Sequence, residues 1–424
     1  RSYGYAPSSQ DKNHSEICDP SVNKYCGTGS KHRSTSQSLG KLKIIRMTTV
    51  GLSLDIFCRG LLHELSADYE VIALASPDSR LSELGHREGV RYIGVSMRRD
   101  ISPLSDLISL FRLVRVMRKE RPDMLHTMTP KAGLLGMLAA KIVRVPLRVH
   151  TFTGLVFPTS RGLKRRLLKL TDRVTCACAT HIIPEGEGVK ADLISNRITT
   201  KPMRVLGHGN VRGIDPGHYT HTPEIDAEAE ILRTRLGISR KARVFVFIGR
   251  FVGDKGLREL LEAFATLNRN DDCHLILVGD FEGGADDLHP DELTGIPCLH
   301  LSGGWVDDVR PWLAAADIFI FPSYREGFPN VVLEAGALSL PSIVTDINGS
   351  REIITDGTNG LIVPSHDSGS LRKAMLKMLD LPVDRLAEMG ENARCNVVTR
   401  YSQRYVRDCL KQFYTDIIND RTPR

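Results

Sequence analysis

Short runs of apolar and β-branched residues alternate with helix-length amphipathic segments through most of this chain, in two successive series. The runs of the first series are Leu42–Ile45, Val71–Ala75, Tyr92–Val95, Met124–His126, Arg148–Phe152, His181–Ile183 and Met203–Leu206. A polar stretch, His218–Ala229, separates them from the second series. The runs of the second series are Val244–Ile248, Leu275–Val278, Cys298–Leu301, Ile318–Phe321, Ser342–Val344 and Gly360–Val363. Because strands that alternate with helices form parallel, doubly wound sheets, the sequence predicts an α/β fold with two Rossmann-like domains.

The length of the chain fits this division, since 424 residues exceed what one hydrophobic core usually serves. We predict an N-terminal domain over 41–212, a linker over 213–240 and a C-terminal domain over 241–400. The segment 401–424 is expected to be a helix long enough to cross back to the first domain. The polar residues 1–40 are expected to be a disordered or non-native extension. Ligands of such sheets bind beyond the carboxyl ends of the strands, so the two domains should face each other across a cleft.

Charge is divided unevenly between the two halves. Residues 41–212 hold 29 Lys and Arg against 15 Asp and Glu, whereas residues 213–424 hold 23 against 32. This asymmetry predicts that the first half meets an anionic partner. No apolar run approaches the roughly 18 residues that a membrane-spanning helix needs, so a membrane role would be confined to the surface. The hydrophobic share of 41% excludes disorder for most of the length.

A loop rich in glycine and cations follows the run Val244–Ile248. It contains Gly249, Arg250 and Lys255, and an amphipathic segment follows it. Glycine lets the backbone approach a ligand, arginine offers a planar fork, and lysine adds a point charge at a helix start. This pattern favours a diphosphate site, although a surface loop with solvated charges has the same composition. Neither the Walker spacing nor a dinucleotide-binding glycine motif is present.

Two glutamates follow the run Ile318–Phe321. Glu326 is expected on the loop after this strand and Glu334 in the first turn of the next helix. Both carboxylates should then face the cleft, and the helix dipole should keep Glu334 ionised to accept the hydroxyls of a ribose. Free amides from Phe328 to Val331 are expected to bind a phosphate or sugar oxygen. The alternative is one glutamate that caps a helix and another that lies on the surface.

Together these motifs resemble those of the family 4 glycosyltransferases of the GT-B fold. The matching positions of the second half are Gly249-Arg250, Lys255-Gly256, Leu277-Val278-Gly279-Asp280, Ala316-Asp317-Ile318-Phe319, Pro322-Ser323, Glu326 to Ala335 and Asn359 to Val363. The first half is similar to the bacterial branch that builds capsule, O-antigen and related surface glycans, at Arg121-Pro122-Asp123, His126, Thr129 to Gly136, Gly209-Asn210 and Gly213-Ile214-Asp215. The resemblance spans about residues 41–420, and its segment from Glu326 to Glu334 is highly specific.

The resemblance implies a role for each matching residue. Arg250 and Lys255 would hold the leaving diphosphate, while Glu334 would bind the ribose. Glu326 would address the donor sugar, and His126 would contact the sugar or the acceptor across the cleft. The implied catalytic set is Glu326, Arg250, Lys255 and His126. The positions implied for binding the nucleotide sugar are Glu334, Gly249, Gly304, Trp305, Val306, Gly327, Phe328, Pro329, Asn330 and Val331, with the base near 304–306. No metal or other cofactor is implied.

Three segments depart from the pattern of the family. The loop Thr48–Ser53 lacks the common Gly-Gly pair, and Gly209–Gly213 carries two residues where relatives usually run from asparagine directly into glycine. Pro184-Glu185 stands where relatives commonly place a small polar pair. These departures predict reshaped sites, with an unusual substrate or a weakened activity.

The segment Arg161–Leu170 has leucines broadly on one face and cations on the rest, which is typical of helices that lie in anionic headgroup regions. Four cations are expected to face the acceptor or the membrane: Lys131, Lys164, Arg165 and Arg166. In the alternative reading, the leucines pack on the sheet and the cations are solvated. No nucleic-acid-binding motif accompanies this segment, so no nucleic-acid partner is expected.

The resemblance therefore implies a retaining transferase (EC 2.4) that moves a hexosyl or N-acetylhexosaminyl unit from a nucleotide sugar, with uridine diphosphate as the expected carrier. The expected acceptor is a hydroxyl of a polyprenyl-diphosphate-linked saccharide in bacterial surface polysaccharide synthesis. The expected location is cytoplasmic, peripheral on the anionic inner face of the membrane. The alternatives are a sugar-nucleotide epimerase, a glycan phosphorylase and a non-catalytic sugar-nucleotide-binding scaffold protein.

Overall fold

The computed structural model describes residues 41–100, 102–267, 273–284 and 286–421, and the predicted extension at 1–40 lies outside them. The first half forms a six-stranded sheet in the order β3-β2-β1-β4-β5-β6. Its strands are β1 (Lys43–Val50), β2 (Glu70–Ser76), β3 (Arg91–Gly94), β4 (Met124–Met128), β5 (Leu147–Phe152) and β6 (His181–Pro184). The prediction of a further strand at Met203–Leu206 is wrong, since Met203 forms only an isolated bridge with Ile182. Pro202 precedes it and offers no N–H to a ladder.

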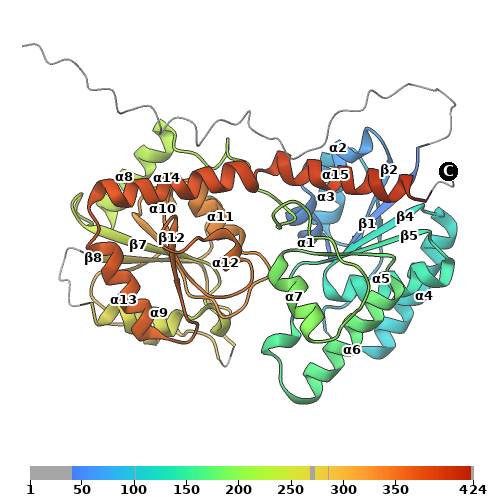
Figure 1. Ribbon diagram of the computed structural model, residues 1–424, viewed down its shortest axis with the longest axis horizontal. Helices are drawn as coiled ribbons and strands as arrows, with labels where there is room; N and C mark the ends of the chain where they lie inside the picture. Colours follow the sequence, from blue (N-terminus) through green and yellow to red (C-terminus); the bar gives the residue numbers. More distant parts are fainter. Residues whose placement is uncertain (1–40, 101, 268–272, 285, 422–424) are drawn as a thin grey trace, which may run out of the picture. The chain divides into compact units, whose positions relative to one another are not determined.

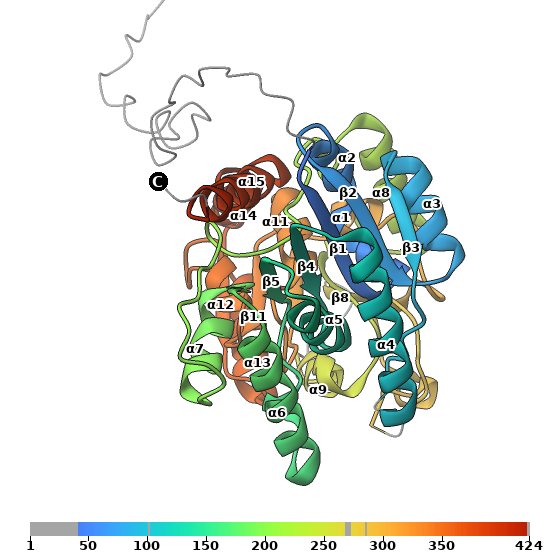
Figure 2. The ribbon, with the colours of Figure 1, turned by 90° about the vertical axis from the view of Figure 1, so that its right-hand side faces the viewer.

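Helices cover both faces of this sheet. They are α1 (Gly51–Cys58), α2 (Leu61–Ser66), α3 (Ser79–Glu88), α4 (Pro103–Glu120), α5 (Pro130–Val143), α6 (Gly162–Cys178) and α7 (Glu187–Ser195). Adjacent residues of a strand point to opposite faces, so each face has its own core. Ile45 is buried with residues of α4, α5 and α6, whereas Ile44 is buried with residues of α1, α2 and α3. Figure 2 shows α4, α5 and α6 as neighbouring helices.

The second half repeats this arrangement in a six-stranded sheet with the order β12-β11-β10-β7-β8-β9. Its strands are β7 (Arg243–Ile248), β8 (Cys273–Val278), β9 (Leu299–Leu301), β10 (Ile318–Phe321), β11 (Ser342–Thr345) and β12 (Gly360–Val363). All the pairings within both sheets are parallel. The order starts in the middle and reverses once, as in doubly wound folds. The prediction of two Rossmann-like domains is therefore confirmed.

The segment 213–240 contains more than the linker that was predicted. It includes α8 (Pro223–Arg235), which packs against α10 (Arg310–Ala314). Ala229 and Leu232 of α8 are buried in the core of the second domain. The polar composition concealed this helix because only one face of it is buried. The other helices of this half are α9 (Leu257–Ala265), α11 (Asn330–Ala337), α12 (Ser350–Ile353), α13 (Ser368–Leu379) and α14 (Val383–Arg400).

The last helix, α15 (Gln403–Asn419), packs on the first domain. Tyr401, just before it, is buried in the core of the second domain. Phe413 and Tyr414 are buried with Ile44 on one face of the first sheet. Figure 1 shows α15 in red along the blue elements of the first half. Helix α15 thus packs on the domain that residues of the first half form.

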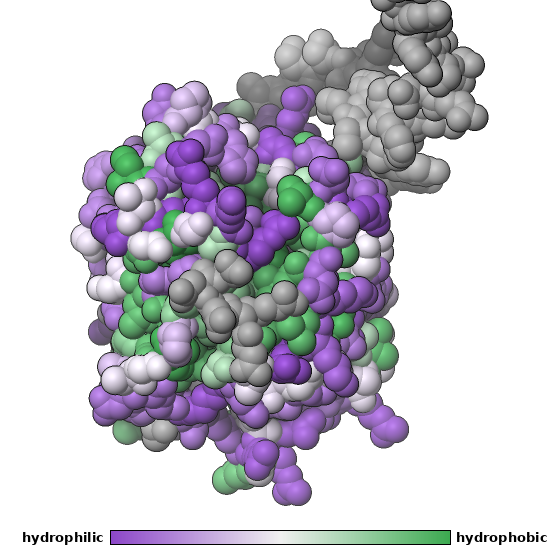
Figure 3. Space-filling view, turned by 90° about the vertical axis from the view of Figure 1, so that its left-hand side faces the viewer, coloured by the Kyte–Doolittle hydropathy of each residue, from purple (hydrophilic) through white to green (hydrophobic). Residues whose placement is uncertain are grey.

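Hydrophobic side chains also reach the surface. On the side shown in Figure 3, hydrophobic residues gather in the middle of the face, and hydrophilic residues surround them. β9 is an edge strand of the second sheet, and its Leu301 is exposed. Among the helices of the described residues, none is long and apolar enough to span a membrane.

Candidate active site

Two loops at the carboxyl ends of neighbouring strands carry the predicted cations and carboxylates. β7 and β10 pair directly, and each ends in one of these loops. Lys255, in the short helix η2 (Gly253–Lys255), contacts the carboxylate of Glu326 on the loop after β10. Ser323 donates its hydroxyl to the same carboxylate at 2.9 Å. The ammonium of Lys255 also lies 5.2 Å from the ring centroid of Phe321, so an aromatic face helps to hold it.

The close approach of these loops requires glycine at one position. Gly256 has a φ of +66°, and a Cβ there would lie 2.1 Å from the carbonyl oxygen of Pro322. The N–H of Tyr324 donates to the carbonyl oxygen of Asp254 at 2.8 Å, which joins the two loops through their backbones. The backbone therefore brings the two charged side chains together.

Arg250 lies on the exposed side of this site. Its guanidinium donates to both carboxylate oxygens of Glu282 at 2.9 Å. Exposed pairs of this kind contribute little to stability, so Arg250 can exchange Glu282 for another anion. The adjoining cavity, of about 920 Å³, has a lining that includes Arg161, Arg165, Arg250, Arg258, Glu282, Tyr324 and His366. It brings cations of the first domain beside those of the second.

Glu334 has different partners from those expected. It lies within α11 and is only 8% exposed, and Arg212 pairs with its carboxylate at 3.4 Å. Burial raises the pKa of Glu334, and Arg212 and a hydrogen bond with Tyr219 offset this only in part. Glu334 lies beyond the first turn of α11, so the prediction that it sits in that turn, where the helix dipole would keep it ionised, is wrong. Desolvation outweighs Arg212 and Tyr219 because most of the carboxylate is removed from water.

The loop that brings Arg212 to Glu334, Gly209–Gly213, is one of the three segments that depart from the family pattern. Asn210 has a φ of +64°, and its side-chain oxygen accepts from the N–H of Arg212 at 2.9 Å and from that of Gly213 at 2.6 Å. The additional residues therefore form a compact turn that presents Arg212 to the site. Sequence reasoning missed Arg212 as a functional residue, and the altered spacing of Gly209–Gly213 was the signal that pointed to it.

The loop predicted to hold a base follows β9. Gly304 forms an isolated bridge with Gly279, and its carbonyl oxygen accepts from the hydroxyl of Ser302 at 2.7 Å. Trp305 is 75% exposed, whereas Val306 packs partly on the core of the domain. The indole therefore offers a flat apolar face beside a loop that is anchored at both ends.

The segment 327–331 meets the first domain. Phe328 is buried with its ring centroid 5.4 Å from that of Tyr401. The side-chain oxygen of Asn330 accepts from the amide of Asn210 at 2.9 Å. Within the described part of the chain, the N–H groups of Gly327 and Phe328 donate to no protein acceptor. They can therefore donate to a ligand oxygen.

His126 does not reach the cleft, so its predicted contact with a sugar or acceptor is contradicted. It is 1% exposed inside the first domain. Its Nδ1 lies 2.6 Å from the hydroxyl of Tyr414 and 2.6 Å from the guanidinium of Arg46, and its Nε2 lies 2.7 Å from the hydroxyl of Thr151. Burial, with the charge of Arg46, holds the pKa of His126 well below its usual value. The imidazole is neutral, and its nitrogens are occupied.

Lys131 is also engaged inside the first domain. Its ammonium pairs with Asp106 of α4 at 2.6 Å and donates to the carbonyl oxygen of Asp100 at 2.8 Å. The prediction that it faces the acceptor or the membrane is corrected, because this pair ties the start of α5 to α4 and leaves little of the side chain exposed.

Comparison with known proteins decides the family. Residues 56–209 match the model of a glycosyl transferase 4-like domain, and residues 242–381 match that of the glycosyl transferases group 1. The chain is 30% identical over 383 residues to the capsular polysaccharide biosynthesis glycosyltransferase CapM of Staphylococcus aureus, which covers 89% of this chain and 98% of that protein. The chain belongs to the family 4 glycosyltransferases. The prediction of a transferase of class EC 2.4 is thereby confirmed.

A second relative and a solved structure agree with this family. The glycosyltransferase is 29% identical over 326 residues to the UDP-Gal:alpha-D-GlcNAc-diphosphoundecaprenol alpha-1,3-galactosyltransferase of Escherichia coli, covering 76% of this chain and 82% of that protein. The structure of Anabaena Alr3699/HepE in complex with UDP matches it with a TM-score of 0.73 at 18% identity, over 88% of this chain and 100% of that chain. This likeness confirms the GT-B fold.

The basic helix α6 of the glycosyltransferase exposes leucines as well as cations. Leu163 is 81% exposed, and Leu167, Leu170 and the cations Lys164, Arg165 and Arg166 are exposed as well. Only Leu168 packs partly on the core, so the alternative in which these leucines cover the sheet does not hold. The first half of α4 exposes a second apolar stripe, formed by Leu104, Leu107, Ile108 and Phe111.

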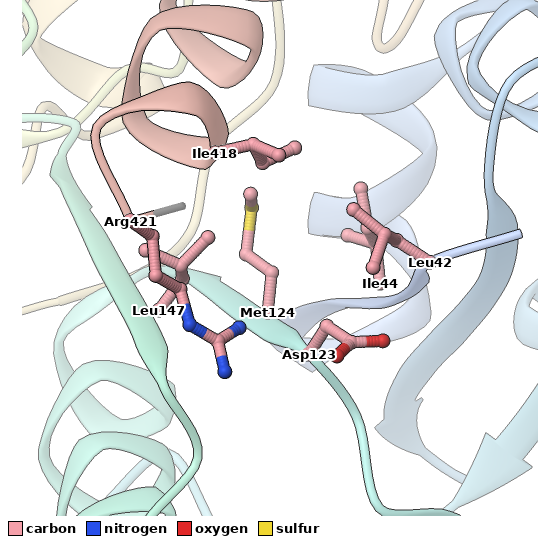
Figure 4. Close-up of a pocket in the computed structure, with 7 residues that line it drawn as sticks. All are labelled: Leu42, Ile44, Asp123, Met124, Leu147, Ile418 and Arg421. Carbon is pink, nitrogen blue, oxygen red and sulfur yellow. The ribbon is translucent and has the colours of Figure 1, made fainter. Parts of the chain in front are cut away.

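A separate cavity of the glycosyltransferase, of about 220 Å³, lies at the opposite edge of the first sheet. Figure 4 shows its lining of Leu42, Ile44, Asp123, Met124, Leu147, Ile418 and Arg421. It lies where β1, β4 and β5 begin, beneath the end of α15. The loops described above follow the carboxyl ends of strands, so this cavity is not part of the candidate site.

Proposed function

We propose that this glycosyltransferase moves a hexosyl or N-acetylhexosaminyl unit from a uridine diphosphate sugar to a hydroxyl of a polyprenyl-diphosphate-linked saccharide, in the synthesis of a bacterial surface polysaccharide. The observation that carries the proposal is the cavity that Arg161 and Arg165 line together with Arg250 and Arg258. Cations from both domains around one space can bind a donor and an acceptor that each carry a diphosphate. The name of the relative from Escherichia coli specifies a UDP sugar and a diphosphoundecaprenol acceptor.

Arg250 and Lys255 are proposed to bind the diphosphate of the donor. Each already pairs with a carboxylate, Arg250 with Glu282 and Lys255 with Glu326. A diphosphate carries more negative charge than one carboxylate, so it can take over both cations. The freed carboxylate of Glu326 then accepts hydroxyl groups of the donor sugar.

Glu334 and Trp305 are proposed to bind the nucleoside. Arg212 favours the ionised form of Glu334, which accepts the two hydroxyls of the ribose. The exposed indole of Trp305 stacks on the base. These contacts support a nucleotide donor, and the amides of Gly327 and Phe328 complete the site with donors for a phosphate or sugar oxygen.

The transfer is proposed to retain the anomeric configuration and to need no metal. The acceptor oxygen bonds to the anomeric carbon on the face from which the diphosphate oxygen departs. That departing oxygen takes the proton of the acceptor hydroxyl, so atoms and charge balance without a protein base. Arg250 and Lys255 stabilise the negative charge that develops on the leaving group, a task that a metal ion performs in other enzymes.

The enzyme is proposed to act as a peripheral protein on the cytoplasmic face of the membrane, where lipid-linked acceptors are presented to it. Helices of a doubly wound sheet begin at the edge where the strands end, so the exposed apolar stripes of α4 and α6 begin near the candidate site. Leucines and arginines that are exposed side by side favour an anionic bilayer surface.

A transfer assay tests the proposal. Four donors, the UDP conjugates of glucose, galactose, N-acetylglucosamine and N-acetylgalactosamine, are each offered with polyprenyl-diphosphate-linked saccharides in vesicles that contain EDTA. We expect free UDP and an elongated acceptor whose new bond keeps the configuration of the donor. An isomerised sugar nucleotide without elongation would identify an epimerase. Donor binding without turnover on any acceptor would identify a scaffold protein.

A further inference from the structure

Glu185 is a buried carboxyl group without a partner. It follows β6 directly and is only 3% exposed. Within the described residues, its side chain takes part in no hydrogen bond or ion pair, although its backbone is fixed on both sides. Its N–H donates to the carbonyl oxygen of Phe152 at 3.0 Å, and its carbonyl oxygen accepts from the N–H of Asn210 at 2.8 Å. Both carboxylate oxygens keep a small contact with solvent, so a largely buried acidic group without a protein partner remains open to a ligand.

The side chain of Glu185 points at the loop that carries Glu326. A Cβ added to Gly327 would lie 2.6 Å from Oε2 of Glu185, and 2.6 Å from the carbonyl oxygen of Thr153. It would also lie 2.8 Å from the Cα of Gly154. The first domain therefore brings a carboxyl group against the segment whose glutamate and free amides are proposed to hold the donor sugar.

A neighbouring glutamate shows what a structural carboxylate looks like at this contact. Glu352 of α12 accepts from the N–H of Glu187 at 2.7 Å and from that of Gly188 at 3.0 Å, so both of its oxygens satisfy the start of α7. The side chain of Glu185, two residues before Glu187, has no such task. Its place between the two domains leaves a ligand as its partner.

The electrostatic surroundings select the kind of ligand. Burial raises the pKa of Glu185 well above its usual value, and the negative charges of Glu326 and Glu352 raise it further. The raised pKa favours the protonated form of the carboxyl group, which can both donate and accept a hydrogen bond. No cation contributes to this shift, so the surroundings disfavour a phosphate and favour a neutral hydroxyl group.

We propose that the carboxyl group of Glu185 binds a hydroxyl of the donor sugar, opposite the loop of Glu326 and Gly327. The sugar is thus recognised from both domains, and Glu185 contributes to the choice among sugars. This inference rests on the proposed function, because it requires a nucleotide sugar in the site.

The test compares binding of the four UDP sugars with binding of UDP alone, by titration calorimetry on the full chain. Glu185→Leu removes the hydrogen bonds at similar volume, Glu185→Gln keeps a donor and an acceptor, and Glu187→Gln changes an exposed carboxylate nearby as a control. We expect Glu185→Leu to weaken the binding of the preferred UDP sugar about tenfold or more, while the affinity for UDP changes less than about twofold. Glu185→Gln should lose less affinity for this UDP sugar than Glu185→Leu, and Glu187→Gln should bind it as the wild type does.

Thermal unfolding separates this role from a structural one. Removing a largely buried carboxyl group that has no protein partner should leave the melting temperature of both Glu185 variants equal to that of the wild type or higher. A lower melting temperature with equal losses for UDP and UDP sugars would overturn the inference and show a structural residue. Unchanged affinity for the preferred UDP sugar in Glu185→Leu would overturn it as well. If the wild type binds none of the four UDP sugars, the proposed donor itself is wrong.

Discussion

The ammonium of Lys255 contacts the carboxylate of Glu326, 71 positions further along the chain. The pair joins the loops after β7 and β10, which are adjacent strands of the second sheet. Each side chain holds the other at the carboxyl edge of the sheet. A nucleotide sugar would offer its diphosphate to Lys255 and its sugar hydroxyls to Glu326. The contact of these residues therefore marks where the diphosphate and the sugar of such a ligand would meet.

Replacing Lys255 by methionine should slow transfer strongly. The substitution keeps an unbranched side chain but removes the ammonium, whose charge is proposed to stabilise the departing diphosphate. We expect kcat/KM to fall by about 10²- to 10³-fold, measured by UDP release with the preferred donor and acceptor. Arg240→Met is the matched control, since Arg240 is exposed and, among the described residues, forms its ion pair with Glu230 alone. Equal rates for the two variants would refute the role of Lys255.

Replacing Arg212 by methionine should weaken donor binding in a pH-dependent way. Arg212 lowers the pKa of Glu334, which burial raises. Without the cation the pKa rises further, so less of the carboxyl group is ionised at neutral pH. We expect the KM for the UDP sugar to increase about 3- to 30-fold at pH 7 and to recover as the pH rises. Arg212→Lys should restore much of the affinity, and a pH-independent KM in Arg212→Met would contradict this account.

Asp172 of α6 should make the protein less stable at higher pH. Burial raises its pKa from 3.8 to about 7, and no cation offsets this. The folded chain therefore binds more protons than the unfolded chain between these values, and stability falls as the pH rises through that range. Asp172→Asn should raise the free energy of unfolding by about 1 to 3 kcal/mol at pH 8, with a smaller gain at pH 4.5. Urea denaturation at both pH values measures the free energy of unfolding. An equal gain at both pH values would contradict a raised pKa of Asp172.

Tyr414 should anchor α15 to the first domain. Its hydroxyl accepts from the guanidinium of Arg46 at 2.8 Å and lies 2.6 Å from Nδ1 of His126. Tyr414→Phe keeps the ring but removes one hydrogen-bond partner from each of Arg46 and His126. We therefore expect a loss of about 1 to 2 kcal/mol in the free energy of unfolding. Tyr92→Phe, at an exposed position of β3, serves as the control. Stability equal to the wild type would mean that the hydroxyl contributes nothing to the anchor.

The exposed leucines of α6 should contribute to membrane binding. Replacing Leu163, Leu167 and Leu170 together by serine removes the exposed apolar surface of this helix. We expect partitioning onto vesicles that contain anionic lipids to weaken about tenfold or more, with an unchanged melting temperature. Ile231→Ser, at an exposed position of α8, is the control in a sedimentation assay. Equal partitioning of the triple variant and the control would exclude this face as the membrane contact.

Much of the fold was predictable because hydrophobic periodicity is a local signal. All six strands of the second sheet and six of the first lie at predicted runs. The prediction of a strand at Met203–Leu206 was wrong because an apolar run does not show whether a partner strand lies beside it. Pro202 also lacks the N–H that a strand ladder needs. The helix α8 was missed because its buried face is narrow within a polar segment.

The contact of Lys255 with Glu326 required both levels of information. The sequence by itself determined that a loop with cations and a loop with glutamates each follow a strand, since turn and strand signals depend on neighbouring residues. Only the tertiary structure decided that Glu334 pairs with Arg212, that His126 and Lys131 are held inside the first domain, and that Glu185 lies against Gly327. The burial of a side chain and its partners depend on segments that are distant along the chain. They set the charge of a titratable group, because the cost of removing that group from water depends on everything packed around it.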